Sequence, residues 1–194
     1  MKKINRYYFQ VLIPILFLFS LPVFAVEQAG VVIIASGEVF AIEADNNQRK
    51  LRRRSKFFEG ETLRVNDNSK AQVRFLDGTL VSLRADTEIR VDAFHYDENS
   101  NGDQDKNFFT LLKGGFRTIT GAVGKNRPEA HQVNTPVATI GVRGTHYSAV
   151  FDTDLYVGVW QGGVSVKNEK GTIDIGMDAA FNFAQVANIH QSPK

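Results

Sequence analysis

From residue 31 to residue 176 the chain alternates between short hydrophobic runs and clusters of turn-forming residues. Within the runs, β-branched and aromatic residues alternate with polar ones, which favours half-buried strands. No stretch keeps the 3.6-residue hydrophobic period of a helix for more than about three turns. Residues 177–186 fit either a strand or a short helix. We therefore predict an all-β fold, an antiparallel sandwich or roll of many short strands in a single domain.

The clearest predicted hairpin joins residues 71–76 to residues 79–83 through Asp77-Gly78. Asp-Gly between two alternating runs is a strong signal for a tight turn, because such a turn requires positive φ. The glycine pairs Gly114-Gly115 and Gly162-Gly163 separate later runs, and we predict turns there as well.

Residues 133–151 form two extended runs joined at a bend. Thr135-Pro136 favours extended backbone, because proline fixes its own φ and restricts the residue before it. Gly141 and Gly144 interrupt the run at positions where a bulge or corner would require glycine. Arg143 lies inside this hydrophobic run, so it either points to solvent or is buried against a carboxylate.

The first 25 residues have the pattern of a cleavable signal peptide. Three basic residues precede an uncharged stretch at 11–24, and Val23-Phe24-Ala25 offers a cleavage site. The stretch contains two prolines and is shorter than the roughly 18–20 residues of a membrane-spanning helix, although an uncleaved anchor is the alternative. We predict export to the periplasm, with a domain at 26–180, a C-terminal tail at 181–194 and no transmembrane helix in the mature form.

Removing this leader changes the charge balance. It takes away three of the 23 Lys and Arg residues and none of the 21 Asp and Glu residues, which leaves a formal net charge of −1. A globally basic nucleic-acid-binding protein is therefore not indicated, and export would separate the chain from nucleic acid. The chain has no cysteine, so neither a disulfide nor a thiolate metal site can form.

The chain carries no recognisable catalytic pattern. No serine stands in a nucleophile-elbow motif, and no glycine-rich loop opens a helix that could bind phosphate. The histidines have no short metal-ligand spacing between them; they are His95, His131, His146 and His190. We therefore predict a protein that is not an enzyme and that has no catalytic residue, metal site or cofactor.

The loop at 97–105 imitates the beginning of a calcium-binding loop, with oxygen-bearing side chains at alternate positions and Gly102 sixth. Phe108 stands where the bidentate glutamate is expected. A polar hairpin loop around Asn101-Gly102 is the favoured interpretation, and calcium binding is the alternative.

Two stretches are candidate binding surfaces. One is a run of positive charge that either forms a solvated edge or steers an acidic protein face or anionic lipid headgroups: Arg49, Lys50, Arg52, Arg53, Arg54 and Lys56. The other is residues 155–160, which are apolar on both faces, as in a covered central strand. If one face is open, Tyr156 and Trp160 on either side of Gly158 form a platform for a sugar or a partner side chain.

Several motifs, in this order and spacing, resemble the FecR family. The most specific is T-P-x-A-x-x-G-V-R-G-T at 135–145, and the others are F-L-D-G-T at 75–79, L-K-G-G at 112–115 and a closing segment at 156–166. The resemblance covers about residues 30–176. The matching motif positions are Asp77, Gly78, Gly114, Gly115, Thr135, Pro136, Arg143, Gly144, Thr145, Gly162 and Gly163.

The resemblance implies a periplasmic β-rich domain that binds another protein. In signalling members of the family, the domain relays the state of an outer-membrane TonB-dependent transporter to a cytoplasmic sigma factor. Because six residues precede the hydrophobic run of the leader and about 18 follow Gly176, we expect a free-standing exported form of the domain. Our prediction is a non-enzymatic periplasmic protein that contacts another envelope protein in signalling or assembly. A carbohydrate- or peptidoglycan-binding module is the alternative.

Overall fold

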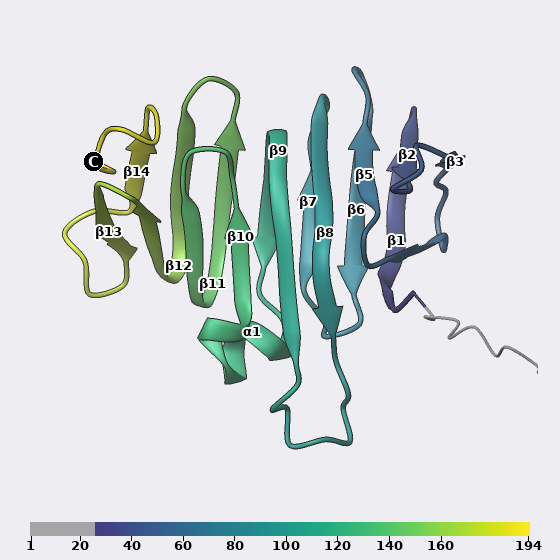
Figure 1. Cartoon of the computed structure of the whole chain (residues 1–194), viewed down its shortest axis with the longest axis horizontal. Helices are drawn as coiled ribbons and strands as arrows, with labels where there is room; N and C mark the ends of the chain where they lie inside the picture. Colours follow the sequence, from purple (N-terminus) through teal and green to yellow (C-terminus); the bar gives the residue numbers. More distant parts are fainter. Residues whose placement is uncertain (1–25) are drawn as a thin grey trace, which may run out of the picture.

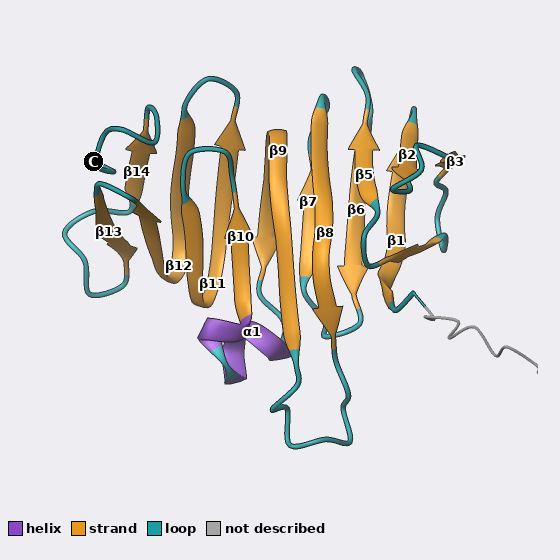
Figure 2. Cartoon of the chain, in the orientation of Figure 1, coloured by secondary structure: helices purple, strands orange, loops and turns teal. Residues whose placement is uncertain are grey.

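The computed structural model describes residues 26–194, so the predicted signal peptide lies outside the described residues. Strands dominate this part of the chain (Figure 2), and neither helical segment within it is long and hydrophobic enough to cross a membrane. The elements in chain order are β1 (Gln28–Ser36), β2 (Val39–Ile42), β3 (Gln48–Lys50), β4 (Lys56–Phe58), β5 (Thr62–Val65), β6 (Lys70–Phe75), β7 (Leu80–Leu83), β8 (Thr87–His95), β9 (Lys106–Ile119), α1 (Ala122–Asn126), the 3-10 turn η1 (Pro128–Ala130), β10 (His131–Asn134), β11 (Thr139–Phe151), β12 (Leu155–Asn168), β13 (Gly171–Gly176) and β14 (Phe183–Val186).

All of these strands belong to one hydrogen-bonded sheet, which the long strands β9, β11 and β12 fold into two layers. Residues 106–113 of β9 pair with β8 and β10, whereas residues 114–119 pair with β7 and β11. β12 likewise pairs with β14 through residues 155–158 and with β13 through residues 163–168. Each long strand therefore contributes one half to each layer.

We name the layers after their central strands. The β8 layer contains β3, β2, β5, β8, the first half of β9, β10, the first half of β11, the second half of β12 and β13. The β6 layer contains β4, β1, β6, β7, the second halves of β9 and β11, the first half of β12, and β14. In Figure 1 the strands of the two layers overlap in pairs, such as β5 with β6 and β7 with β8.

The hydrophobic core lies between the two layers and is centred on a chain of aromatic rings. Neighbouring rings in this chain have centroids 5.1 to 5.9 Å apart, and its members are Phe57, Phe75, Phe109, Phe116 and Tyr147. The alternating burial along β5, β6 and β7 sends every second side chain into this core. Because buried aromatic rings dominate core energetics, this chain of contacts joins the layers into a single domain.

The predicted all-β, single-domain fold is confirmed, with one difference in strand direction. β10 pairs with β9 in parallel, so the sheet is mixed and not antiparallel throughout. The reason is that β9 ends in the β6 layer, and α1 and η1 then carry the chain back to the β8 layer beside the start of β9. β10 therefore begins at the same end as the first half of β9 and runs in the same direction (Figure 1).

The glycine pairs for which we predicted turns lie inside continuous strands. Gly114, Gly144 and Gly162 have φ of 82°, 60° and 79°, and each lies where its strand passes from one layer to the other. A Cβ at Gly114 would lie 2.4 Å from the carbonyl oxygen of Asp86, so the position requires glycine for space as well as for φ. These residues make bends, because hydrogen bonding to neighbouring strands continues on both sides of them.

The C-terminal residues that the sequence suggested as a tail include β14, which pairs with β12. The last residue also returns to this strand: the N–H of Lys194 donates to the carbonyl of Gln185 at 3.0 Å, and the N–H of Gln185 donates back at 2.8 Å. The ambiguous stretch at 177–186 therefore ends in a strand.

Candidate interaction face

The Asp-Gly-Thr motif anchors the hairpin of β6 and β7 to helix α1. The buried carboxylate of Asp77 accepts hydrogen bonds from the Thr79 backbone N–H at 2.9 Å and from its hydroxyl at 2.8 Å. The Thr79 Oγ1 accepts from the Gly121 N–H at 2.9 Å, and the Asp77 carbonyl accepts from the Ala122 N–H at 2.8 Å. The predicted hairpin is present with a longer loop than expected, and in that loop Gly78 has a φ of 84°. The Asp-Gly-Thr motif therefore has a structural role, because it fixes the hairpin to the start of α1.

The most specific motif, at 135–145, has two parts with different environments. The Thr135 Oγ1 accepts hydrogen bonds from the N–H groups of Ala138 and Val137 and donates to the Ala138 carbonyl at 2.8 Å, which closes the turn between β10 and β11. Thr145 ties β11 to the end of β9, since its carbonyl accepts the hydroxyl hydrogen of Thr120 at 2.9 Å. Pro136 and Arg143 are exposed. Arg143 therefore points to solvent, the first of its two predicted possibilities.

The structure divides the predicted basic run between the two layers. Arg49 and Lys50 lie on β3 in the β8 layer, whereas Lys56 lies on β4 in the β6 layer. The Arg49 guanidinium donates to the Glu61 carboxylate at 2.6 Å, and Glu61 is 5% exposed and also accepts from the Phe58 N–H. Arg49 therefore stabilises the fold, while exposed Arg52, Arg53 and Arg54 lie in the turn that leads to β4, with Lys56 beyond it.

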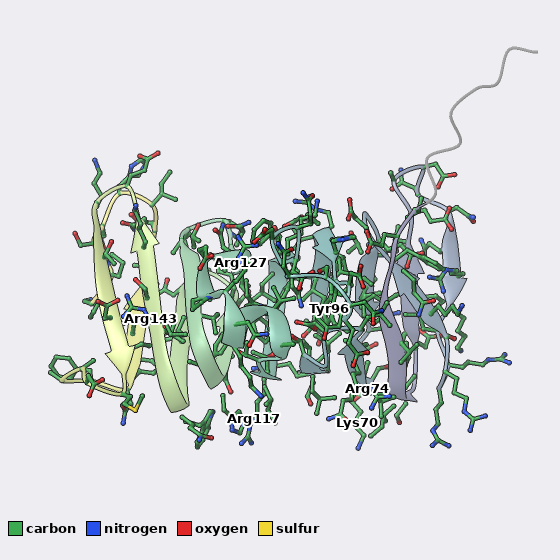
Figure 3. All side chains as sticks on the ribbon, turned by 90° about the horizontal axis from the view of Figure 1, so that it is seen from below. Lys70, Arg74, Tyr96, Arg117, Arg127 and Arg143 are labelled. Atoms are coloured by element: carbon green, nitrogen blue, oxygen red, sulfur yellow. The ribbon has the colours of Figure 1, made fainter. Side chains whose placement is uncertain are left out.

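The outer surface of the β6 layer is rich in positive charge, and we call it the β6 face. No Asp or Glu occurs in the strand segments that form this layer within residues 26–194. Lys70, Arg74 and Arg117 project from the same side of the molecule (Figure 3). None of them belongs to an ion pair among the described residues. The strands of the β6 face are therefore positively charged and carry no carboxylate to neutralise that charge.

The outer surface of the β8 layer has a different charge arrangement, because its strands carry carboxylates that pair with some of its basic residues. Arg64 donates to Glu88 at 2.7 Å, and Lys113 approaches the same carboxylate at 3.3 Å. Arg90 pairs with Asp92 at 2.7 Å. Surface pairs of this kind contribute little to stability, but they cancel much of the local field. Other basic residues on strands of this layer belong to no ion pair among the described residues: Lys50, Lys106, Arg143 and Lys167. The two layers therefore differ in their carboxylates, which the strands of the β8 layer carry and those of the β6 layer lack.

Aromatic side chains occupy the other end of the β6 face. Trp160 is 67% exposed and Tyr156 is 40% exposed, and both lie on the same side of β12. Arg117 lies over the Trp160 ring, 5.0 Å from its centroid, and Tyr156 stacks on Phe183 with centroids 6.0 Å apart. The predicted platform therefore lies on an open face, and β14 extends it with Phe183.

His146 links the basic and aromatic ends. Its Nε2 accepts a hydrogen bond from the Arg117 Nε–H at 2.6 Å, and its ring lies 6.5 Å from the Trp160 ring. Partial burial, followed by the positive charge of Arg117, lowers the pKa of His146. The imidazole is therefore neutral at pH 7 and orients Arg117 over the tryptophan.

The remaining candidate sites were a metal site and the calcium-like loop at 97–105. Among residues 26–194, no group of three or more His, Cys, Asp or Glu side chains converges as a metal site would require. In the loop at 97–105, the carbonyls of Gly102 and Asp103 accept hydrogen bonds from Arg127 at 2.7 and 2.6 Å. A guanidinium thus holds two carbonyls of the loop that we compared with a calcium site.

Sequence reasoning missed the residues that join the two candidate surfaces. Lys70 and Arg74 stand at alternate positions of a clear strand, so their common outward direction was available from the pattern. The positions of Arg117 and Phe183 beside Trp160 and Tyr156 could not be predicted from the pattern, because they depend on strands that pair across long sequence separations.

Comparisons with known proteins agree with this architecture. The profile of the FecR protein family matches residues 61–165. Two crystal structures of a protein from Parabacteroides distasonis ATCC 8503, described as a proposed anti-sigma factor, superpose with TM-scores of 0.52 and 0.51. In both cases the sequence identity is 22%, and the match covers 69% of this chain and 57% of the other. No curated protein matches the chain.

The family profile covers more than half of the chain and includes the Asp-Gly-Thr hairpin, the L-K-G-G bend and the whole motif at 135–145. The structural matches span the same kind of β-rich fold, although they extend over little more than half of the matched chains. The protein belongs to the FecR family.

Proposed function

We propose that this chain is exported to the periplasm and acts without catalysis, by binding another envelope protein in signalling or envelope assembly. Membership in the FecR family supports a regulatory role, and the link to TonB-dependent iron-uptake signalling is part of the proposal. The observation that carries it is the difference between the two outer surfaces. The β6 face has exposed cationic and aromatic side chains and no Asp or Glu in its strands, whereas the strands of the β8 layer carry carboxylates that pair with Arg64, Arg90 and Lys113.

A protein with an acidic surface fits the β6 face best. Opposite charge raises the rate of encounter, and exposed Trp, Tyr and Arg side chains are the types that dominate binding energy at protein interfaces. The turn residues Arg52, Arg53 and Arg54 lie at the cationic end, where they would steer the approach of such a partner.

Site-specific photocrosslinking in cells tests this surface directly. A photoreactive residue at Ser82, which is on β7 in the β6 layer, should give one discrete crosslinked envelope protein. The matched control is Lys167, which is exposed on the half of β12 that belongs to the β8 layer. Equal crosslinking from both positions, or a product found inside the cytoplasm by fractionation, would contradict the proposal.

The charged turn has its own test once that partner is known. Replacing Arg52, Arg53 and Arg54 together with serine should slow association by about tenfold at low salt and flatten its salt dependence. Unchanged association rates in the triple variant would discard the steering role while leaving the aromatic contact open to the crosslinking test.

The second candidate function is glycan binding, which the open side of β12 favours. Tyr156 and Trp160 are separated by Gly158, so a flat ring could stack between or over them. Trp160 is the chain's single tryptophan, and its fluorescence should change on titration with soluble peptidoglycan fragments. A flat titration at millimolar concentration counts against this function, and the variant Tyr156→Ala should weaken any binding that is seen.

A further inference from the structure

A hollow of about 220 Å³ lies at the cationic end of the β6 face. Its floor is the β1 segment Val31–Ile33, and its walls carry Arg53, Arg54 and Arg74. The turn that bears two of these arginines is fixed to β1, because the Arg54 N–H donates to the Val32 carbonyl at 2.8 Å and the Val32 N–H donates to the Ser55 carbonyl at 2.8 Å. Two separate elements therefore bring arginines to one place.

The register of β1 with its two neighbours explains this convergence. Val31 stands opposite Arg74 of β6 and opposite Lys56 of β4. Directly opposed residues in an antiparallel pair share a face, so Lys56 and Arg74 flank Val31 on the outer surface. The register of β1 and β6 then shifts between Val32 and Ile34, which marks a bulge at the floor of the hollow.

The three guanidinium groups are not neutralised by the protein. Arg53, Arg54 and Arg74 take part in none of the ion pairs among residues 26–194, and all three are exposed. Arginine keeps its charge at any physiological pH, so these charges repel one another wherever they approach. An anion bound in the hollow would attract all three guanidinium groups and offset their mutual repulsion. The planar guanidinium groups also present hydrogen-bond donors in an arrangement that suits oxyanions.

Arg54 adds an independent observation. Its φ is 71°, whereas the other non-glycine residues with positive φ are Asn46, Asn68, Asp86 and Asp178. Asn and Asp tolerate this left-handed conformation, but an arginine there costs conformational free energy. Backbone strain of this kind clusters at binding sites, where the side chain's task outweighs the loss of stability.

We propose that this hollow is a binding site for a phosphate-class anion, supplied either by a lipid headgroup or by a soluble phosphate. Three guanidinium groups suit a tetrahedral oxyanion better than a planar carboxylate. The lining residues Val31–Ile33 offer an apolar surface for a group esterified to the phosphate. Arg53 and Arg54 hold the anion from the turn, and Arg74 holds it from β6. The inference deepens the proposed function, since it assigns a ligand chemistry to one end of the β6 face.

The first experiment titrates the mature chain with inorganic phosphate, and separately with acetate, at constant ionic strength by calorimetry. We expect saturable binding of phosphate at one site and far weaker binding of acetate. Arg74→Gln and Arg54→Asn should each weaken phosphate binding by about tenfold, the loss typical of one charge-assisted hydrogen bond. Arg84→Gln is the matched control, because Arg84 is exposed, lies outside the hollow and is in no described ion pair.

Arg54→Asn keeps the test independent of folding. Asparagine tolerates the backbone at this position, so the variant should bind phosphate more weakly and yet melt at a higher temperature. The proposal is overturned if Arg84→Gln loses as much affinity as the hollow variants, if acetate binds as tightly as phosphate, or if phosphate does not saturate.

A vesicle experiment distinguishes the two sources of phosphate. Phosphatidylcholine vesicles are prepared with and without phosphatidylglycerol, and sedimentation of the mature chain is measured with free phosphate as competitor. Binding to the anionic vesicles that phosphate displaces and Arg74→Gln abolishes assigns the site to headgroups; phosphate binding without vesicle binding assigns it to soluble phosphates. Loss of phosphate binding with intact crosslinking from Ser82 would leave the proposed function standing.

Discussion

His131 should make the stability of the domain depend steeply on pH. The ring is 1% exposed and packs edge-on against Phe109, with the ring centroids 6.0 Å apart. Neither ring nitrogen has a hydrogen-bond partner among the described residues. Burial lowers the pKa of His131 from 6.5 to about 4, while the negative charge of Asp77 acts in the opposite direction. The folded domain therefore holds this imidazole in its neutral form.

The sign of the effect follows from the pH at which the unfolded and the folded state each take up the proton. The unfolded chain protonates this histidine near pH 6.5 and the folded chain only near pH 4, so the unfolded state binds more protons between these values. Stability is fully present above the unfolded pKa and falls as the pH decreases through this window. With about 1.4 kcal/mol for each unit of pKa difference, the free energy of unfolding falls by about 3 kcal/mol by pH 4.

Urea denaturation of the mature chain at several pH values measures this loss, and His131→Leu is the comparison. Leucine is similar in volume and does not titrate, so the variant should lose about 3 kcal/mol less than the wild type between about pH 7 and about pH 4. Carboxylate protonation destabilises both proteins and cancels in the difference. Parallel curves for the two proteins would refute the assignment of a buried neutral histidine.

Three further predictions concern backbone strain and a buried carboxylate. Gly114→Ala should cost at least about 3 kcal/mol, since its Cβ would meet the Asp86 carbonyl, whereas Gly78→Ala, with similar φ and open space, should cost about 1 kcal/mol in the same denaturation assay. Arg54→Asn should raise stability by about 1 kcal/mol in thermal unfolding, and an unchanged melting temperature would remove the strain argument. Glu61→Gln should destabilise by about 2 kcal/mol, because it leaves the partly buried Arg49 without its counter-charge, and a neutral outcome would show that the pair adds nothing.

The fold class was predictable because its signal is local. Alternating hydrophobic positions and the Asp-Gly turn specify strands and one hairpin without reference to the rest of the chain. The bends at Gly114 and Gly162 were not predictable as bends, because a glycine that ends a strand and one that folds a continuous strand look alike in sequence. What distinguishes them is the pairing on both sides, which involves residues from distant parts of the chain.

The candidate surfaces show the same limit. Residues 49–56 look like one basic patch in sequence, but the structure assigns Arg49 to an ion pair with Glu61 and leaves the turn residues on another layer. The Tyr156 and Trp160 platform was predictable as far as their common side of a strand. Whether that side was open could not be read from the sequence, because a strand with two apolar faces is usually covered on both.

Folding one sheet on itself has a consequence for how such a domain can present its surfaces. Because β9, β11 and β12 each pass from one layer to the other, a single strand supplies outward residues to both outer surfaces: Tyr156 and Trp160 lie on the β6 face, while Lys167 of the same strand lies on the other. The binding character of each face is therefore set by residues from many strands and not by one continuous motif. Arg53 and Arg74, which meet at one hollow, are the clearest case. The family-motif residues of this chain hold bends and turns, whereas the outward positions between them give each face its charge and its aromatic surface.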